Sequence, residues 1–367
     1  MSPLSQIALT LIHGLGSTTL RRLVELYPGQ DIFALPPSEL RQAFGSHRDI
    51  AESIISRSTF ARAEEELRFC EKNHIRTLFF TDPAFPSRLN RPETADCPAL
   101  LYVMGDLDLN HPHPVAIVGT RRATAAGRDA TNLFVKQLAS YEALIVSGLA
   151  YGIDTAAHSA ALDHALPTAA VLGHGLDRIY PTANRPLARR IIEQGGALVT
   201  EYPSQTDINP SFFPARNRII AALADATLVV EASDKGGALI TAALANSYQR
   251  EVFAVPGRIG DTYSRGTNAL IATNRALLAR NADDIAYQLG WKAAAQAADS
   301  DPTLFPTLSA DEQRTLDLMR KHDFLTLDEL AAIAEIPLPK AAALLFGLEM
   351  KKMVHTLPGH KYQVVMK

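Results

Sequence analysis

Cysteine is nearly absent from this sequence of 367 residues, which contains only Cys70 and Cys97. Two isolated cysteines cannot build a disulfide framework or a cysteine-rich zinc site, so we expect reduced thiols packed in a core. No apolar run reaches the roughly 18 residues that cross a bilayer, and the first residues have neither a basic region nor a small-residue cleavage site. We therefore expect a cytoplasmic protein without a membrane segment.

Sequence motifs of several enzyme classes are also missing. The sequence has no GxxxxGK[ST] P-loop, and no GxGxxG motif follows a predicted strand. It also has no GxSxG, no HExxH and no pair of carboxylates at catalytic spacing. These absences favour a binding protein over an enzyme, and we expect no metal and no cofactor.

An excess of positive charge is missing too. The net charge is −3, and residues 111–290 contain 16 Lys and Arg against 15 Asp and Glu. Such a balance argues against a protein that coats nucleic acid through bulk attraction. Any basic ligand site must therefore be a local cluster in a nearly neutral domain.

The length of the chain predicts two or three domains. Residues 1–66 have helical periodicity, with Gly14 and Gly16 in a turn typical of a SAM-like or helix-hairpin-helix module. Such a turn can offer backbone amides to DNA phosphate, or it can serve helix packing alone. Residues 291–307 are rich in Ala and then polar, which predicts a linker, and residues 308–367 predict a winged helix with three helices and two strands.

Residues 67–290 predict an extended Rossmann-like domain. Two strand-like segments, TLFF and PALLYVMG, come first. From residue 113, short apolar runs alternate with helical stretches, as in a parallel sheet with crossover helices. The predicted strands span 115–118, 143–146, 169–172, 197–200, 227–231 and 251–255. The fold class is therefore α/β, and ligands of such sheets bind at the carboxyl ends of the strands.

The turn after the first of these strands, VGTRRAT, combines flexibility with positive charge. Gly119, Thr120, Arg121 and Arg122 end the strand, and Thr124 can cap the following helix. Backbone amides at a helix N-terminus and an arginine fork together bind anions. A solvated surface arginine is the alternative.

The next two turns are rich in glycine. In SGLAYGIDTAAH, Ser147, Gly148 and Gly152 predict an irregular loop, with Asp154 as a helix cap and His158 one turn later as a core histidine or a site residue. In GHGLDRIYP, Gly173 and Gly175 lie at the sheet edge. The ring of Tyr180 can stack on a base or serve packing alone.

The segment FFPARNRIIAAL is the most informative. Pro214 suits a first helical turn, and Arg216 and Arg218 flank Asn217. Their mutual repulsion calls for a ligand anion or for a carboxylate such as Glu201 or Glu231. Further along the chain, SDKGGALITAALA predicts a second phosphate cradle from backbone amides. Its residues are Lys235, Gly236, Gly237 and Thr241.

The motifs AIVGTRRAT, VSGLAYGIDTAAH, AVLGHGLDRIYP, FPARNRIIA, GGALITAALA and GTNALI occur in that order. Together they resemble the DNA-processing protein A family, also called DprA or Smf, over nearly all of residues 98–275. The resemblance implies a protein that binds single-stranded DNA, forms a homodimer through its Rossmann domain and loads the RecA recombinase during natural transformation. It implies a DNA pocket of Gly119, Thr120, Arg121, Ser147, Gly148, Gly152, Asp154, Gly173, Gly175, Tyr180, Arg216, Asn217, Arg218, Gly236, Gly237 and Thr241. It also implies a dimerisation and recombinase-contact region around Leu270 and Ile271.

Three features depart from the family pattern. Tyr151 stands where the family usually has arginine, which removes a phosphate contact and adds a ring that can stack. His174 stands where a small residue is common, and residues 272–278 replace a stretch rich in Gly and Ala. We expect altered affinity rather than lost function. In the predicted winged helix, the third helix has few cations beyond Lys340, Lys351 and Lys352, which favours a protein contact or weak duplex binding.

Two other functions remain as alternatives. A nucleotide hydrolase of the lysine-decarboxylase-like group has a similar sheet, but its PGGxGTxxE pattern carries a glutamate that KGGALITAA lacks. An assembly adaptor would instead use the winged helix to dock a partner and keep the pocket only as a relic.

Overall fold

The computed structural model describes residues 1–293, 308–320, 322, 324–351, 353–357 and 361–364. It divides into two compact units, Met1–Ala295 and Gln296–Lys367. Most of the predicted linker, residues 294–307, lies outside the described residues.

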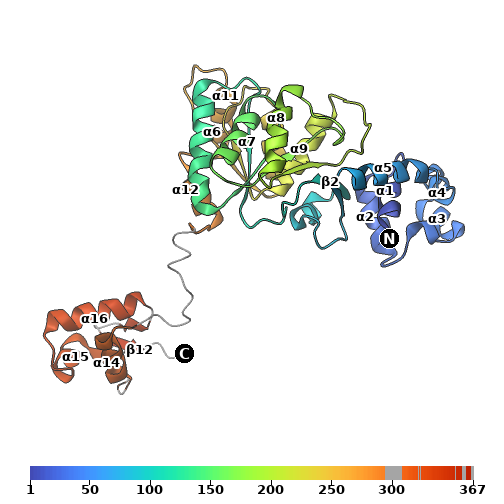
Figure 1. Cartoon of the computed structure of the whole chain (residues 1–367). Coiled ribbons are helices and arrows are strands. Elements are labelled where there is room, and N and C mark those ends of the chain that lie inside the picture. The colour runs from blue at the N-terminus through green and yellow to red at the C-terminus, as the bar shows by residue number, and fades with distance from the viewer. Residues whose placement is uncertain (294–307, 321, 323, 352, 358–360, 365–367) are drawn as a thin grey trace. The chain divides into compact units, whose positions relative to one another are not determined.

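The first unit is built around a nine-stranded sheet of order β1-β2-β6-β5-β4-β3-β7-β8-β9 (Figure 1). All pairs from β6 to β9 are parallel, and β1 and β2 extend the sheet antiparallel beyond β6. The six strands predicted for the parallel sheet are confirmed within two residues at each end. Strand bounds are β1 Ile75–Phe79, β2 Leu100–Met104, β3 Pro114–Val118, β4 Leu144–Ser147, β5 Thr168–Val171, β6 Ala197–Thr200, β7 Ala226–Val229, β8 Glu251–Ala254 and β9 Leu277–Leu278.

The central strands are buried along their whole length and mostly apolar because helices cover both faces of the sheet. On β3, Val115 and Ile117 join the core under α6, α7 and α12, whereas Ala116 and Val118 join the core under α8 to α11. This alternation follows from the two-residue period of a strand. Helix bounds are α6 Ala125–Leu138, α7 Ile153–Asp163, α8 Arg185–Glu193, α9 Phe212–Leu223, α10 Gly237–Ser247, α11 Arg265–Ala272 and α12 Ala282–Leu289.

The N-terminal residues form helices, as predicted. Gly14 has φ +82°, a value that favours glycine, and Gly16 is the N-cap of α2. Arg21 on α2 is buried and donates to the carbonyls of Leu89 and Pro98, which ties this helix to the sheet. The helices are α1 Pro3–Thr10, α2 Ser17–Leu26, α3 Pro37–Phe44, α4 Arg48–Ile55 and α5 Phe60–Lys72.

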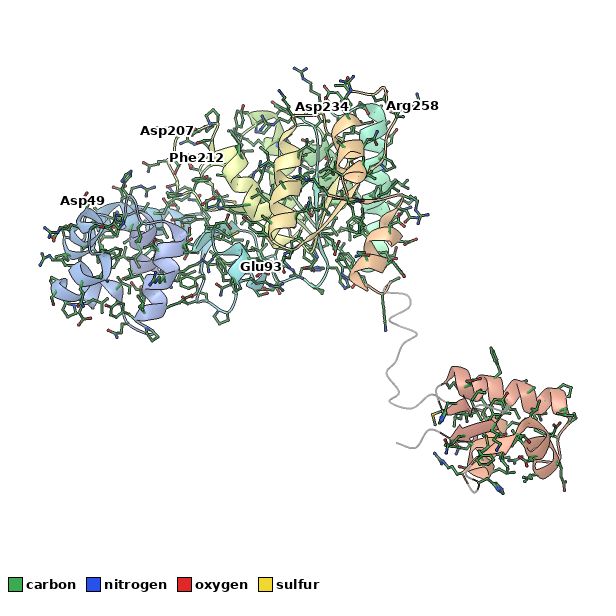
Figure 2. All side chains as sticks on the ribbon, turned by 180° about the vertical axis from the view of Figure 1, so that it is seen from behind. Asp49, Glu93, Asp207, Phe212, Asp234 and Arg258 are labelled. Atoms are coloured by element: carbon green, nitrogen blue, oxygen red, sulfur yellow. The ribbon has the colours of Figure 1, made fainter. Side chains whose placement is uncertain are left out.

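A second link joins α5 to the loop between β6 and α9, which Asp207 marks in Figure 2. Glu66 on α5 is 1% exposed and accepts hydrogen bonds from the Ser204 amide at 2.9 Å and the Ser204 hydroxyl at 2.6 Å. The domain boundary predicted at residue 66 thus lies inside α5, and the helical residues and the sheet share one compact unit.

The second unit has its own core, with Leu316, Leu330, Leu345 and Val354 among its buried residues. The predicted three helices and wing are confirmed, and the short strand β10, which was not predicted, completes a sheet of order β10-β12-β11. Its elements are α14 Ala310–Met319, β10 Leu325–Thr326, α15 Leu327–Ile333, α16 Leu338–Met350, β11 Val354–Leu357 and β12 Lys361–Val364.

Both cysteines are buried, and this burial raises the pKa of each thiol to about 12, in line with structural thiols. Among the described residues, no three His, Cys, Asp or Glu side chains gather into a group that could hold a metal ion. In the same part of the chain, no single helix is long and apolar enough to span a membrane. The bent pair of α15 and α16 passes that test only when both are taken together.

Candidate functional site

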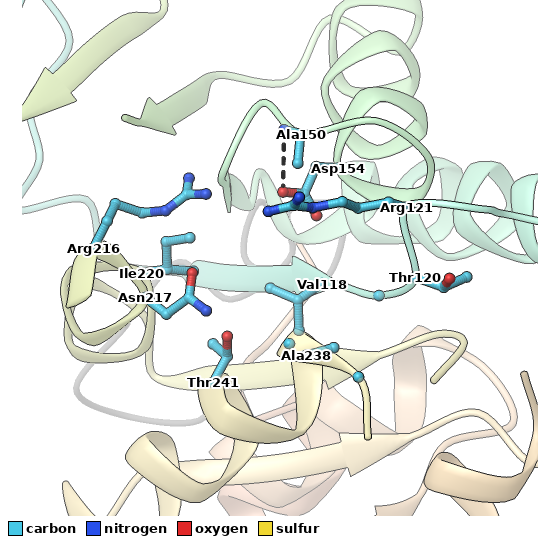
Figure 3. Close-up of a pocket in the computed structure, with 13 residues that line it drawn as sticks. Val118, Thr120, Arg121, Ala150, Asp154, Arg216, Asn217, Ile220, Ala238 and Thr241 are labelled. Atoms are coloured by element: carbon cyan, nitrogen blue, oxygen red, sulfur yellow. Dashed lines mark hydrogen bonds between the residues drawn. The ribbon is translucent and has the colours of Figure 1, made fainter. Parts of the chain in front are cut away.

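A pocket of about 220 Å³ opens at the carboxyl end of β3, between the turns that lead into α6, α7 and α10 (Figure 3). The structure therefore brings together residues predicted from four separate motifs. The predicted residues that line it are Gly119, Thr120, Arg121, Asp154, Arg216, Asn217, Gly236, Gly237 and Thr241.

The turn after β3 holds Arg121 at the pocket. A Cβ at Gly119 would lie 2.8 Å from the Cβ of Ile153, so only glycine fits this close approach to α7. Arg121 is exposed and has no ion pair within the described residues, and its guanidinium lies 5.7 Å from the ring centre of Phe213. Figure 3 shows it pointing toward Asp154 and the pocket. Arg121 therefore keeps its hydrogen-bonding capacity for a ligand.

At the N-terminus of α6, where VGTRRAT predicts an anion site, the structure places a carboxylate of the protein itself. Thr124 is the N-cap of α6, as predicted, and accepts from the Gly127 amide. Glu231 already occupies this end of the helix, because its carboxylate accepts from the Thr124 amide at 3.0 Å and from the Thr124 hydroxyl. The anion at this helix N-terminus is the protein's own side chain.

The N-terminus of α10 is different. Gly236 is its N-cap, and no side chain among the described residues caps its first amides. Gly236 and Gly237 both line the pocket, so this end of the helix faces it without a protein anion. Backbone amides in that position are suited to a phosphate. Lys235 is exposed beside this turn but does not line the pocket, and Thr241 lies in the second turn of α10.

Arg216 forms the floor of the pocket. It is 4% exposed, and its Nη1 donates to the carbonyls of Gly148, at 2.6 Å, and Val171. Burial lowers the pKa of Arg216 to about 10, and the charge of Asp154 opposes this effect. Figure 3 shows the guanidinium pointing from α9 toward Asp154 and Arg121. Arg216 therefore stays protonated at neutral pH and joins the ends of β4 and β5 to α9.

Asp154 is not the helix cap that the sequence predicts. The N-cap of α7 is Gly152, with φ +81°, and Asp154 is the second residue of the helix. Its buried carboxylate accepts from the Ala150 amide at 3.3 Å. Burial raises the pKa of Asp154, while the positive charge of Arg216 lowers it. The two buried side chains thus influence each other through their opposite charges, without a direct ion pair among the described residues.

Arg218 needs no ligand to balance its charge. Its guanidinium donates to both carboxylate oxygens of Glu201, one of them at 2.7 Å, and to the carbonyl of Asp96. Burial alone would lower the pKa of Arg218, but Glu201 holds it above its ordinary value. Of the two alternatives for the arginine pair, the carboxylate is correct for Arg218, and the predicted ligand contact is not supported.

An aromatic hollow adjoins the pocket and shares Arg121 and Arg216 with it. Tyr180 and Tyr151 line it and are 45% and 50% exposed, and the ring centres of Tyr180 and Phe213 lie 5.6 Å apart. The sequence motifs did not point to Phe213 as a ligand contact. The pattern that could have indicated it is an aromatic residue in the first turn of a helix that also contains Arg216 and Arg218.

His174 explains how Tyr180 is held. It is fully buried; its Nδ1 lies 2.9 Å from the Gly175 carbonyl, and its Nε2 accepts from the Tyr180 amide at 3.1 Å. Donation to the carbonyl and acceptance from the amide require a neutral ring, and burial lowers the pKa of His174 accordingly. This departure from the family pattern therefore holds the backbone under Tyr180.

Several predicted residues have structural roles instead. His158 is fully buried and bonds Thr168 through Nδ1 at 2.7 Å, as a core histidine does. Ser147 is buried and donates to the Ile117 carbonyl. Gly152 and Gly175 allow close backbone approaches at which a Cβ would clash. The predicted residues that line neither the pocket nor the hollow are Arg122, Ser147, Gly152, Gly173, Gly175, Arg218 and Lys235.

Leu270 and Ile271 lie on α11, away from the pocket lining. Leu270 lines a groove between α10 and α11 together with Leu239, Ala243 and Ala269. Ile240 on α10 is 45% exposed. This edge of the first unit is therefore partly apolar.

Comparison with known proteins gives consistent matches along the chain. Residues 76–290 match the family described as DNA recombination-mediator protein A, and residues 292–360 match the DprA winged helix domain. The chain is similar to Protein Smf of Synechocystis sp., with 31% identity over 97% of both chains. It is also similar to Protein Smf of Escherichia coli, with 36% identity over 72% of both chains.

Two solved structures are also similar. The X-ray structure of DNA processing protein A from Streptococcus pneumoniae has a TM-score of 0.68 and 32% identity, covering 79% of this chain and 98% of that one. DNA processing protein A from Helicobacter pylori, whose structure concerns a unique single-stranded DNA binding mode, has a TM-score of 0.51 and 33% identity. That match covers 59% of this chain and 97% of the Helicobacter chain.

Proposed function

Because the chain belongs to the DNA recombination-mediator protein A family, we propose that it binds single-stranded DNA across the pocket and the aromatic hollow. One observation carries this proposal: an uncapped helix N-terminus, an arginine without an ion pair among the described residues, and exposed aromatic rings meet at one sheet edge. The amides of α10 and Arg121 suit phosphates, and the rings of Tyr151 and Tyr180 suit unstacked bases. A duplex keeps its bases stacked inside and cannot use such rings.

The ligand contacts that we propose are fewer than the sequence predicts. Gly119, Thr120, Arg121 and Asn217, with the amides of α10, face the phosphates, and Lys235 lies within reach of the strand outside the pocket. Arg216 acts mainly by holding the pocket floor. Two or three neutralised phosphates would give a log–log dependence of affinity on salt of about −1.4 to −2.1 for single strands.

The test is a fluorescence anisotropy titration of a labelled single-stranded oligonucleotide and of its duplex, at several salt concentrations. We expect the single strand to bind more tightly and its affinity to fall with salt. Equal affinity for the duplex, or an affinity that does not depend on salt, would overturn the proposal.

We further propose that the protein acts without catalysis, as a homodimer in the cytoplasm. In this role it protects incoming single strands and loads RecA recombinase during natural transformation and recombination. The partly apolar edge formed by α10 and α11, where Ile240 is 45% exposed and Leu270 and Ile271 lie on the neighbouring helix, supports the dimer, because burying it would remove exposed apolar surface. Ile240→Glu, at an exposed position of this edge, should shift the mass measured by light scattering from dimer to monomer. Strand exchange by RecA on pre-coated single strands should be stimulated by the protein, and release of free base from nucleoside monophosphates would contradict the non-catalytic role.

A further inference from the structure

The third helix of the winged helix, α16, has an exposed apolar face. Ala341, Leu345 and Leu348 pack into the core of the second unit. On the flank of the helix about 90° away around its axis, Leu338 is 47% exposed and Phe346 is 66% exposed, with exposed Ala342 between them. These three residues are spaced four apart and therefore share one stripe of the helix.

The charges of α16 do not suit DNA. A helix in this position reads DNA with polar and basic side chains. Lys340 lies 2.7 Å from Asp311, and Lys351 lies 2.6 Å from Glu312, so both described lysines at this helix are paired within the domain. Phosphate contacts would have to break these pairs.

The acids near the stripe lie at its two ends. Glu335 precedes α16, is exposed and has no ion pair in the described part of the chain. Glu349 lies in the last turn, and its carboxylate accepts only the neutral hydroxyl of Thr356 among the described residues. An apolar stripe with an acid at each end matches an apolar ridge with basic residues at its ends.

A second copy of the same helix does not fit this pattern. In an antiparallel pair centred on Ala342, the turn before α16 that carries Glu335 in one copy lies near the last turn of α16 in the other, so Glu335 would approach Glu349. In a parallel pair, each glutamate would face its own copy. Both arrangements place acid against acid, which destabilises the contact.

We propose that the α16 face formed by Leu338, Ala342 and Phe346 docks an amphipathic helix of a partner protein, whose apolar ridge is flanked by Lys or Arg. The small side chain of Ala342 lets the partner helix approach closely, and Phe346 is the anchor. This docking does not depend on single-stranded DNA binding, since its residues belong to the second unit.

The test is a selection from a displayed library of helical peptides, which share an apolar ridge and have random residues beside it. Peptides are selected for binding to the full chain, and those that also bind the Phe346→Ser variant are removed. We expect enriched peptides to carry Lys or Arg beside the ridge. The affinity of an enriched peptide should fall about tenfold or more with Phe346→Ser. It should also fall with the double change Glu335→Lys and Glu349→Lys, which touches no core residue. Ile259→Ser, a change at a residue in the first unit that is 92% exposed, is the matched control and should leave binding unchanged.

Failure of any peptide to be enriched, or enrichment of peptides with acidic or neutral flanks, would overturn the proposal. The proposal would also be overturned if Phe346→Ser abolished binding to duplex DNA, binding to anionic vesicles, or self-association measured by sedimentation equilibrium. Affinity for single-stranded DNA should stay unchanged in Phe346→Ser, so failure here is distinguishable from failure of the proposed pocket.

Discussion

Replacing Arg216 with Met should destabilise the first unit while keeping most of the side-chain volume. The carbonyls of Gly148 and Val171 would lose their donor, and Asp154 would keep a buried charge without its opposing partner. Leaving a buried acceptor without its donor costs about 1–3 kcal/mol. With two carbonyls affected and Asp154 able to take up a proton, we expect a total of about 3 kcal/mol, which corresponds to a fall of about 5 °C in the Tm of a unit of this size.

The assay is thermal unfolding followed by tryptophan fluorescence, since Trp291 is the single tryptophan and lies in the first unit. Adding Asp154→Asn to Arg216→Met removes the stranded carboxylate and should recover about half of the lost Tm. The loss in Arg216→Met should also be smaller at acidic than at neutral pH, because the pKa of Asp154 is already raised. Strictly additive effects of the two changes would refute the coupling between these residues.

The other predictions concern Arg121, Arg218, His158 and His174. Arg121→Ala should weaken binding to all single strands and make the salt dependence shallower by about 0.7, whereas Arg218→Ala should leave it unchanged in the same anisotropy titrations. Equal effects would contradict the pairing of Arg218 inside the protein. Burial lowers the pKa of His158 from 6.5 to about 3, so the stability it contributes is present above pH 6.5 and is lost as the pH falls toward 3. In His158→Gln, the free energy of unfolding measured with urea should fall less between pH 6.5 and pH 3. A pH dependence equal to that of the unchanged protein would contradict this role of His158. His174→Ala leaves the Tyr180 amide without its acceptor, so we expect weaker single-strand binding and a lower Tm in the melting assay, with unchanged binding as the contrary result.

The parallel sheet was predictable because its signals are local. Each central strand is an apolar run bounded by a glycine or polar turn, and a strand buried on both faces needs little else. The pocket was predictable for a related reason. The carboxyl ends of parallel strands meet at one edge, so motifs far apart in sequence, such as the turns at Gly119 and Gly236, had to converge.

The partners of individual charges were not predictable. The sequence left open whether Glu201 or Glu231 would balance the arginines, and the folded chain uses them differently. Glu201 pairs with Arg218, whereas Glu231 fills the N-terminus of α6. Both contacts join residues distant along the chain, and no periodic pattern records them. The predicted domain boundary at residue 66 lies inside α5 rather than at its end. The amino-acid composition changes there, but the helix continues to Lys72.

The hydrogen bonds of Glu66 to Ser204 and of Arg21 to Leu89 and Pro98 decide where the chain can be cut. A recombinant fragment limited to residues 76–290 would lack the Arg21 guanidinium, which is the donor of one link, and the Glu66 carboxylate, which is the acceptor of the other. It would also uncover the apolar surface of β1 and β2 that α1 and α5 cover. Such a fragment would be poorly soluble and would misreport the affinity of the pocket, because the loop that leads to α9 would lose its anchor. A fragment that begins at residue 1 and ends after Trp291 would keep every one of these contacts.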